Sequence, residues 1–168
     1  TGYDERIAAE VKDFDPTIAM DRKMARRMSR FIHFAMAAGR EAVADAGLDF
    51  GDWSPERRDR VAVCVNTGGG GLDQVIIGAE VAREKGPNSV SPFAIPAVSG
   101  SMAACQLSMT YGLTGPVITQ VAACASSVIA FLDALRMIQR GEVDVVLAGG
   151  SEAPLQAMAF AALGNMGA

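Results

Sequence analysis

Several residue types and patterns are scarce in this chain of 168 residues. It has one histidine, three cysteines and no Cys-x-x-Cys pair, so the sequence predicts no metal site. An odd number of cysteines in apolar surroundings does not suit a secreted disulfide scaffold and indicates a reducing, cytoplasmic location. The net charge of −4 argues against nucleic acid as a partner.

Charged side chains are absent from residues 86–132. A segment this long without charge raises the question of a membrane, but prolines and glycines interrupt it, and no run of about 20 consecutive apolar residues occurs. We therefore expect no membrane partner and predict that the segment lies in the core and at a subunit interface. The overall hydrophobic content of 50% suits one globular domain with a sizeable core.

Turn residues divide the chain into alternating helices and strands. The helix N-caps are expected at Asp21 and Ser29. The helix after Ser29 is expected to bury one stripe, made of Phe31, Ala35, Ala38, Ala42 and Ala46. This alternation predicts an α/β architecture. Helices are expected over 22–28, 30–46, 72–85, 97–111 and 128–140, and buried strands over 60–66, from 117 and over 143–147, with 51–59 a polar surface connection.

Cys124 lies where a β-rich run that starts at Val117 passes into an apolar helix-like segment. A sharp strand-to-helix turn exposes its central side chain, and small neighbours keep that side chain accessible. The helix N-terminus adds partial positive charge, which favours a thiolate and can stabilise an oxyanion. Cys124 is a candidate nucleophile on this pattern, and a buried structural cysteine remains the alternative.

Four consecutive glycines, Gly68 to Gly71, follow a predicted strand and precede a predicted helix. The pattern is not a nucleotide-binding loop, because Asp73 stands where Gly-x-Gly-x-x-Gly needs its third glycine and no Gly-Lys-Ser/Thr follows. Close backbone packing explains the glycines better. Glu152 follows another predicted strand, and turn polarity explains it as well as chemistry would.

The residues around Cys124 also carry a resemblance. Tyr111–Pro116 followed by Val121–Ser127 closely resembles the active-site signature of the β-ketoacyl-[acyl-carrier-protein] synthases, and Arg26–Phe31, Ser91–Phe93 and Gly141–Glu152 match further blocks. The resemblance runs over essentially the whole chain. It implies a thiolase-like fold, with a mixed β-sheet between helical layers. Residues 1–168 would be most of the first of two related halves, incomplete at both ends.

The resemblance implies a type II elongating synthase, an acyltransferase of fatty-acid or polyketide synthesis. Cys124 would hold the acyl group, its backbone N–H would donate to the oxyanion, and decarboxylative Claisen condensation with malonyl-acyl carrier protein would follow. No cofactor and no metal are implied. The two histidines and the lysine that assist decarboxylation lie in the C-terminal half of such synthases, so this piece alone is expected to be inactive.

Two alternatives stay open. One is a non-condensing relative of the same fold that primes, decarboxylates or sets chain length, and the intact Cys124 argues against it. The other is a cysteine hydrolase or thiol-binding module on an unrelated α/β fold. That module would need a histidine in reach, and His33 is a poor candidate because it lies far from Cys124 in sequence.

The resemblance also assigns pocket residues. Phe93, Ala94 and Ile95 match a loop that the family uses for the acyl pocket and the dimer contact, so a homodimer is expected. Gly69 matches a position where elongating synthases often carry a bulky aliphatic gate, which predicts a roomier or less gated pocket here.

A basic cluster in this acidic chain has two interpretations. It is either a solvated helix face with salt bridges or, by resemblance, the docking surface for the acidic acyl carrier protein, carried over to Lys23, Arg26 and Arg27. One departure weakens the second interpretation, because Asn88 and Ser89 stand where many family members have two basic residues.

Overall fold

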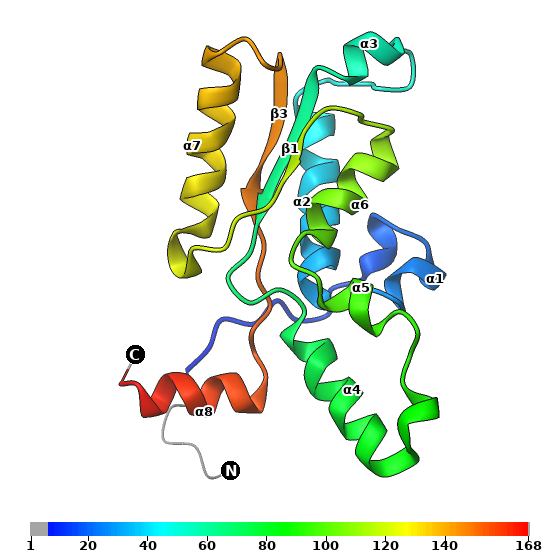
Figure 1. Ribbon diagram of the computed structural model, residues 1–168, viewed down its shortest axis with the longest axis vertical. Coiled ribbons are helices and arrows are strands. Elements are labelled where there is room, and N and C mark those ends of the chain that lie inside the picture. The colour runs from blue at the N-terminus through cyan, green and yellow to red at the C-terminus, as the bar shows by residue number, and fades with distance from the viewer. Residues whose placement is uncertain (1–6, 168) are drawn as a thin grey trace.

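A three-stranded parallel sheet is at the centre of the computed structural model, which describes residues 7–167 (Figure 1). The strands are β1 (Val61–Asn66), β2 (Val117–Ile118) and β3 (Val145–Gly150), in the order β2-β1-β3. Asn66 at the end of β1 pairs with Gly150 at the end of β3. The expected α/β class is confirmed, and the pairs formed within the described residues are all parallel.

Helices cover both faces of the sheet (Figure 1). Helix α7 (Ser126–Gln139) packs on one face, and α2 (Arg30–Asp45) and α6 (Met102–Tyr111) lie on the other. Every residue of β1 is buried, and successive side chains of a strand point to opposite faces. Val61, Val63 and Val65 therefore join the core under α2 and α6, whereas Ala62 and Cys64 pack against α7.

Shorter elements surround this centre. Asp21 caps α1, as predicted, by accepting hydrogen bonds from the N–H groups of Lys23 and Met24. Ser29 occupies the N-cap of α2 but makes no capping bond, because its hydroxyl donates instead to the buried Asp73 at 2.5 Å. Within residues 7–167 no helix is both long and apolar enough to cross a membrane. The remaining elements are α1 (Arg22–Ala25), α3 (Pro55–Arg58), α4 (Leu72–Lys85), α5 (Ala94–Val98), α8 (Ala157–Asn165) and 3-10 turns at Pro16–Ile18, Pro87–Ser89 and Ala123–Ala125.

The helix expected over 97–111 is in fact two helices, α5 and α6. The carbonyl of Val98 accepts a hydrogen bond at 3.1 Å from the N–H of Gly71, in the loop after β1. Ser99 then adopts an extended conformation and ends α5. A tertiary contact with the Gly-rich loop therefore interrupts the helix that the local sequence favours.

The buried stripe of α2 also differs from the expectation. Phe31 and Ala35 are buried as expected, but Ala38, Ala42 and Ala46 are exposed. The helix instead buries the larger Ile32, Met36 and Val43, which remove more apolar surface from water. β3 begins two residues later than expected and continues to Gly150, because β1 offers hydrogen-bond partners as far as Asn66. The segment expected to be a polar connection contains α3, and α8 was not predicted. The residues that α2 buries are Phe31, Ile32, Ala35, Met36 and Val43.

Candidate active site

Cys124 lies in the 3-10 turn Ala123–Ala125, directly before α7, and its side chain is exposed. This exposure contradicts the alternative of a buried structural cysteine. Ala123 has a φ of +46°, a left-handed conformation that is uncommon for a residue with a Cβ. Backbone conformations of this kind cluster at functional sites, where the surrounding structure enforces them.

Two buried polar side chains hold this turn in place. The amide of Asn66 donates to the carbonyl of Ser126 at 2.9 Å and accepts from the N–H of Gln120 at 2.8 Å. The Ser126 hydroxyl donates to the carbonyl of Ala123 at 2.8 Å and accepts from the N–H of Ala122 at 3.0 Å. The end of β1 and the start of α7 thus fix the backbone on both sides of Cys124.

A cavity of about 420 Å³ opens beside Cys124. It lies at the carboxyl ends of β1 and β3, the edge of a parallel sheet where ligands usually bind. Gly150 makes room there, since a Cβ at this position would overlap the Ser127 hydroxyl. Besides the Cys124 turn and the start of α7, the lining comes from the Gly-rich loop and from the segment after β3, with Leu163 of α8.

The Gly-rich loop, residues 67–71, is bonded to Glu152. The Oε2 atom of Glu152 accepts hydrogen bonds from the N–H groups of Gly68 and Gly69, both at 2.7 Å, and from the Thr67 hydroxyl at 3.1 Å. Gly70 has a φ of +60°, which glycine adopts without strain. The glycines thus serve close backbone packing, as the sequence predicts.

Of the predicted pocket residues, the structure brings only Gly69 to the Cys124 cavity. Phe93, Ala94 and Ile95 are not among the lining residues, and the Ile95 side chain is 81% exposed. They form the start of α5, on the other side of the Gly-rich loop.

The predicted docking residues lie on and after α1. Lys23 and Arg26 are exposed, whereas Arg27 is half-buried. The Arg27 guanidinium lies 4.0 Å from the centre of the Phe93 ring, which is a cation–π contact. One residue of the docking set and one of the pocket set are therefore in direct contact.

Two other titratable groups are excluded from the site by their surroundings. Burial raises the pKa of the Cys64 thiol to about 11, so this cysteine stays protonated and unreactive at neutral pH. Burial also lowers the pKa of His33, whose Nε2 lies 2.9 Å from the carbonyl oxygen of Ala25. His33 does not line the Cys124 cavity, in agreement with its dismissal as a base.

Comparison with known proteins identifies the family. The family model described as "Beta-ketoacyl synthase, N-terminal domain" matches residues 3–168. The chain belongs to this family. The resemblance seen in the sequence is thereby confirmed over residues 3–168.

Named relatives agree with this assignment. The synthase domain is 40% identical to a 3-oxoacyl-[acyl-carrier-protein] synthase 2 of Staphylococcus aureus (strain N315), over 95% of the chain and 38% of the relative. It is 39% identical to the Vibrio harveyi protein of the same name, over 98% of the chain and 39% of the relative. The solved structure of "the ishigamide ketosynthase/chain length factor" superposes with a TM-score of 0.83 at 27% identity, covering 94% of the chain and 39% of that structure. The chain thus spans about two fifths of the length of the proteins it matches.

The sequence analysis missed two residues of the candidate site and left the role of a third, Glu152, open. Asn66 and Ser126 hold the Cys124 turn, and Glu152 holds the Gly-rich loop. A weak signal exists for Asn66, because an amide that ends a fully apolar strand is buried and must find hydrogen-bond partners. Asn66 lies 54 residues from Gln120 and 60 from Ser126, and Glu152 lies 84 residues from Gly68, so only the fold reveals these partners.

Proposed function

We propose that the protein containing this chain is a condensing acyltransferase, a 3-oxoacyl-[acyl-carrier-protein] synthase, in which Cys124 is the nucleophile. The observation that carries the proposal is the exposed Cys124 on a fixed strand-to-helix turn, open to a cavity. The Staphylococcus aureus and Vibrio harveyi relatives, each named a 3-oxoacyl-[acyl-carrier-protein] synthase 2, support the same activity. The whole reaction is proposed for the full-length protein, because this chain covers only part of those relatives.

The proposed chemistry begins at the Cys124 sulfur. The thiolate attacks the carbonyl carbon of an acyl thioester, the carbonyl oxygen becomes an oxyanion, and collapse of this intermediate transfers the acyl group and releases the carrier thiol. The backbone N–H of Cys124 is the proposed oxyanion donor from this chain. In the second step the enolate left by decarboxylation of a malonyl thioester attacks the Cys124 thioester, forms the carbon–carbon bond and frees the sulfur.

The 420 Å³ cavity is the proposed entrance of the acyl chain. Gly69 places no side chain in it, which supports a pocket without an aliphatic gate. Phe93, Ala94 and Ile95 lie apart from it, so we propose that they line the pocket only with parts of the assembly beyond this chain. Ile95 is free in this chain to make such a contact.

Acyl carrier protein is the proposed partner, with Lys23, Arg26 and Arg27 as docking residues. The exposed charges of Lys23 and Arg26 support this role, because electrostatic complementarity with an acidic partner mainly raises the association rate. A homodimer through the β2 edge is proposed as well. β2 pairs only with β1 among the described strands, and Val121 just after it is 68% exposed.

The cytoplasm is the proposed location, because its reducing conditions keep an exposed thiol such as that of Cys124 reduced. The intact cysteine favours condensation over the non-condensing alternative.

The decisive experiment is intact-mass measurement of the full-length protein after mixing with an acyl-carrier protein thioester. We expect a mass gain equal to the acyl group, and no gain in Cys124→Ala. Alkylation of Cys124 by iodoacetamide, checked separately, establishes that the thiol is accessible. An alkylatable Cys124 without any acyl gain would contradict the proposal.

A further inference from the structure

The loop of residues 67–71 has almost no side chains of its own to hold it. A Cβ on Gly71 would overlap the carbonyl oxygen of Ala97, and a Cβ on Gly68 would lie 3.5 Å from the carbonyl oxygen of Ala123. The loop is therefore packed between α5 and the turn that carries Cys124. Such a segment is held by backbone hydrogen bonds and by side chains from other parts of the chain.

Glu152 is the side chain that reaches it. Successive backbone N–H groups that converge on one point form a concavity for anions, and the N–H groups of Gly68 and Gly69 converge on Glu152 Oε2. Hydrogen bonds from an N–H to an ionised carboxylate are short and about twice as strong as neutral ones. Within the described residues these two N–H groups have no other side-chain partner. The chain thus supplies its own anion for this concavity.

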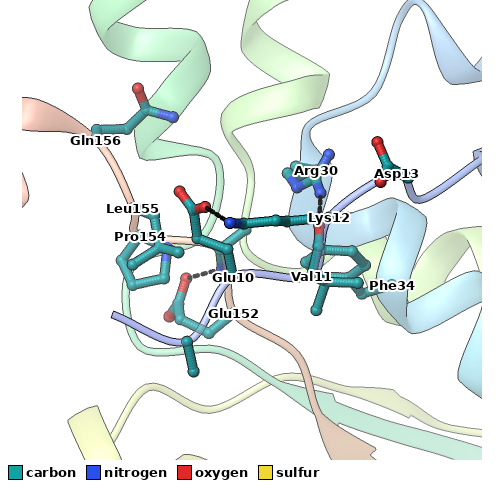
Figure 2. A pocket seen from close by; sticks show the side chains of 12 residues that line it. Glu10, Val11, Lys12, Asp13, Arg30, Phe34, Glu152, Pro154, Leu155 and Gln156 are labelled. Carbon is teal, nitrogen blue, oxygen red and sulfur yellow. Dashed lines mark hydrogen bonds and ion pairs between the residues drawn. The ribbon is translucent and has the colours of Figure 1, made fainter. Parts of the chain in front are cut away.

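Glu152 also forms part of the boundary between two cavities. One is the Cys124 cavity, and the other, of about 490 Å³, is lined by residues 9–13, Arg30 and Phe34 (Figure 2). The cations nearby have different partners. The Lys12 ammonium lies 3.7 Å from Glu10, and the Arg30 guanidinium donates to the carbonyl of Val11. The hydrogen bonds of the Glu152 Oε2 atom therefore all go to the loop, and not to a basic side chain in the described part of the chain.

We propose that Glu152 is a positioning residue, whose carboxylate holds loop 67–71 closed against the Cys124 turn and so sets the width of the acyl entrance at Gly69. The substrate class, acyl thioesters, rests on the proposed function. The contact by which Glu152 holds the loop, called the clamp below, does not depend on the proposed function, because it is a property of the loop alone. Without the carboxylate the loop opens, and the entrance accepts bulkier acyl groups and holds short ones less well.

Hydrogen exchange in the full-length protein tests the clamp without any substrate. In Glu152→Gln, which keeps the shape and loses the charge, the amides of Gly68 and Gly69 are expected to exchange about tenfold faster, because losing charge assistance is worth about 1.4 kcal/mol. Glu152→Asp keeps the charge but is one methylene shorter, so it should fail to restore protection. Glu142→Gln is the matched control, since Glu142 lies 3.5 Å from Arg140 beyond the other end of α7.

Acyl selectivity tests the consequence. The rates at which hexadecanoyl- and butyryl-carrier thioesters acylate Cys124 are compared in the same variants. We expect the ratio of the long-chain to the short-chain rate to rise by about tenfold in Glu152→Gln, matching the loop opening, and to stay unchanged in Glu142→Gln. A residue that merely stabilised the fold would lower both rates alike.

The outcomes separate the two proposals. Unchanged exchange at Gly68 and Gly69 in Glu152→Gln, or equal acceleration throughout β1, would overturn the clamp even if acylation proceeds. If the unsubstituted protein is never acylated, the proposed function fails, while faster exchange confined to the loop still supports the clamp. Faster loop exchange with an unchanged acyl ratio would overturn the role at the entrance.

Discussion

Ala123 is the strained residue next to the candidate nucleophile, with a φ of +46°. A left-handed conformation costs a residue with a Cβ about 1–2 kcal/mol, and glycine avoids this cost. Ala123→Gly is therefore expected to raise the free energy of unfolding by about 1 kcal/mol, measured by urea titration. Ala125→Gly is the control, because Ala125 has an ordinary φ of −85° and glycine there should lower stability by about 0.5–1 kcal/mol. Equal destabilisation by both variants would contradict the strain.

Gly69 is the residue at which a side chain should change the acyl entrance. A Cβ there would lie 3.8 Å from the carboxylate oxygens of Glu152, an ordinary contact, so the position accepts a larger residue. Gly69→Ile in the full-length protein is expected to slow hexadecanoyl transfer to Cys124 by about tenfold, since the new side chain fills space in the cavity at a cost of about 1.4 kcal/mol. Butyryl transfer should stay nearly unchanged. Gly78→Ile on α4, where nothing lies within 4 Å of the new Cβ, is the control. If the hexadecanoyl and butyryl transfer rates are both unchanged in Gly69→Ile, the proposal of an ungated pocket is wrong.

At the scale of elements, the contact between Arg27 after α1 and Phe93 before α5 links the proposed docking surface to the proposed pocket loop. A cation–π contact at a partly exposed site is worth about 0.5–1 kcal/mol. Arg27→Gln and Phe93→Leu should each weaken carrier-protein binding, and the double variant should lose less than the sum of the two. Lys23→Gln, which lacks such a contact, should combine additively with Phe93→Leu. Titration calorimetry of the full-length protein with the carrier measures both cycles, and additive losses for Arg27 and Phe93 would mean that the link is not used in docking.

The elements that the sequence predicted well are those whose hydrophobic pattern is local. β1 is apolar up to Asn66 and is followed by Thr67 and four glycines, and α4 ends at Gly86 as expected. The break between α5 and α6 escaped prediction because its cause, the hydrogen bond from Gly71 to Val98, joins residues that only the fold brings together. The exposed alanines of α2 show a second limit, since small residues at helical spacing do not say which face the larger side chains will bury.

The residues of the candidate site also differ in whether the sequence could predict them. Cys124 could be found because it belongs to a short pattern, a strand-to-helix turn, whereas Gly69 was assigned to the pocket by the family resemblance. They meet in one cavity because Gly69 follows β1 and Cys124 follows β2, and these two strands pair in parallel, which no local pattern reveals. Glu152 was left undecided between turn polarity and chemistry, because its partners are backbone N–H groups and these have no sequence signature.

At the scale of the whole molecule, the buried Cys64 makes stability depend on alkaline pH. An unfolded cysteine ionises near 9.0, whereas the folded Cys64 has a pKa of about 11. Between these values the folded state binds more protons than the unfolded state, so the free energy of unfolding falls as pH rises, by up to about 1.4 kcal/mol per pH unit. The contribution of the protonated Cys64 thiol to the free energy of unfolding is fully present below pH 9 and lost above pH 11. In Cys64→Ala this slope should be smaller, as measured by urea titrations across that range, and an identical slope would contradict the assignment.

The outward face of α7 determines how the 168-residue polypeptide should behave on its own. Phe131 and Leu135 are 59% and 52% exposed, and Val128, Leu132 and Ile138 continue the same stripe at helical spacing. Contiguous exposed apolar surface of this kind normally lies in an interface. The longer relatives have the additional chain that could cover it, since 38% of the Staphylococcus aureus protein accounts for the whole match.

We therefore expect the 168-residue polypeptide to self-associate, with sedimentation velocity showing species larger than a monomer. The double variant Phe131→Ser, Leu135→Ser should shift the distribution toward the monomer, because it removes about 2 kcal/mol or more of apolar burial per copy. Met109→Ser with Ile77→Ser is the matched control, as both side chains are exposed but lie on α6 and α4, away from α7. If the control variant restores the monomer equally well, or the α7 variant leaves the assembly intact, the contact surface lies elsewhere and the α7 face is not what drives association.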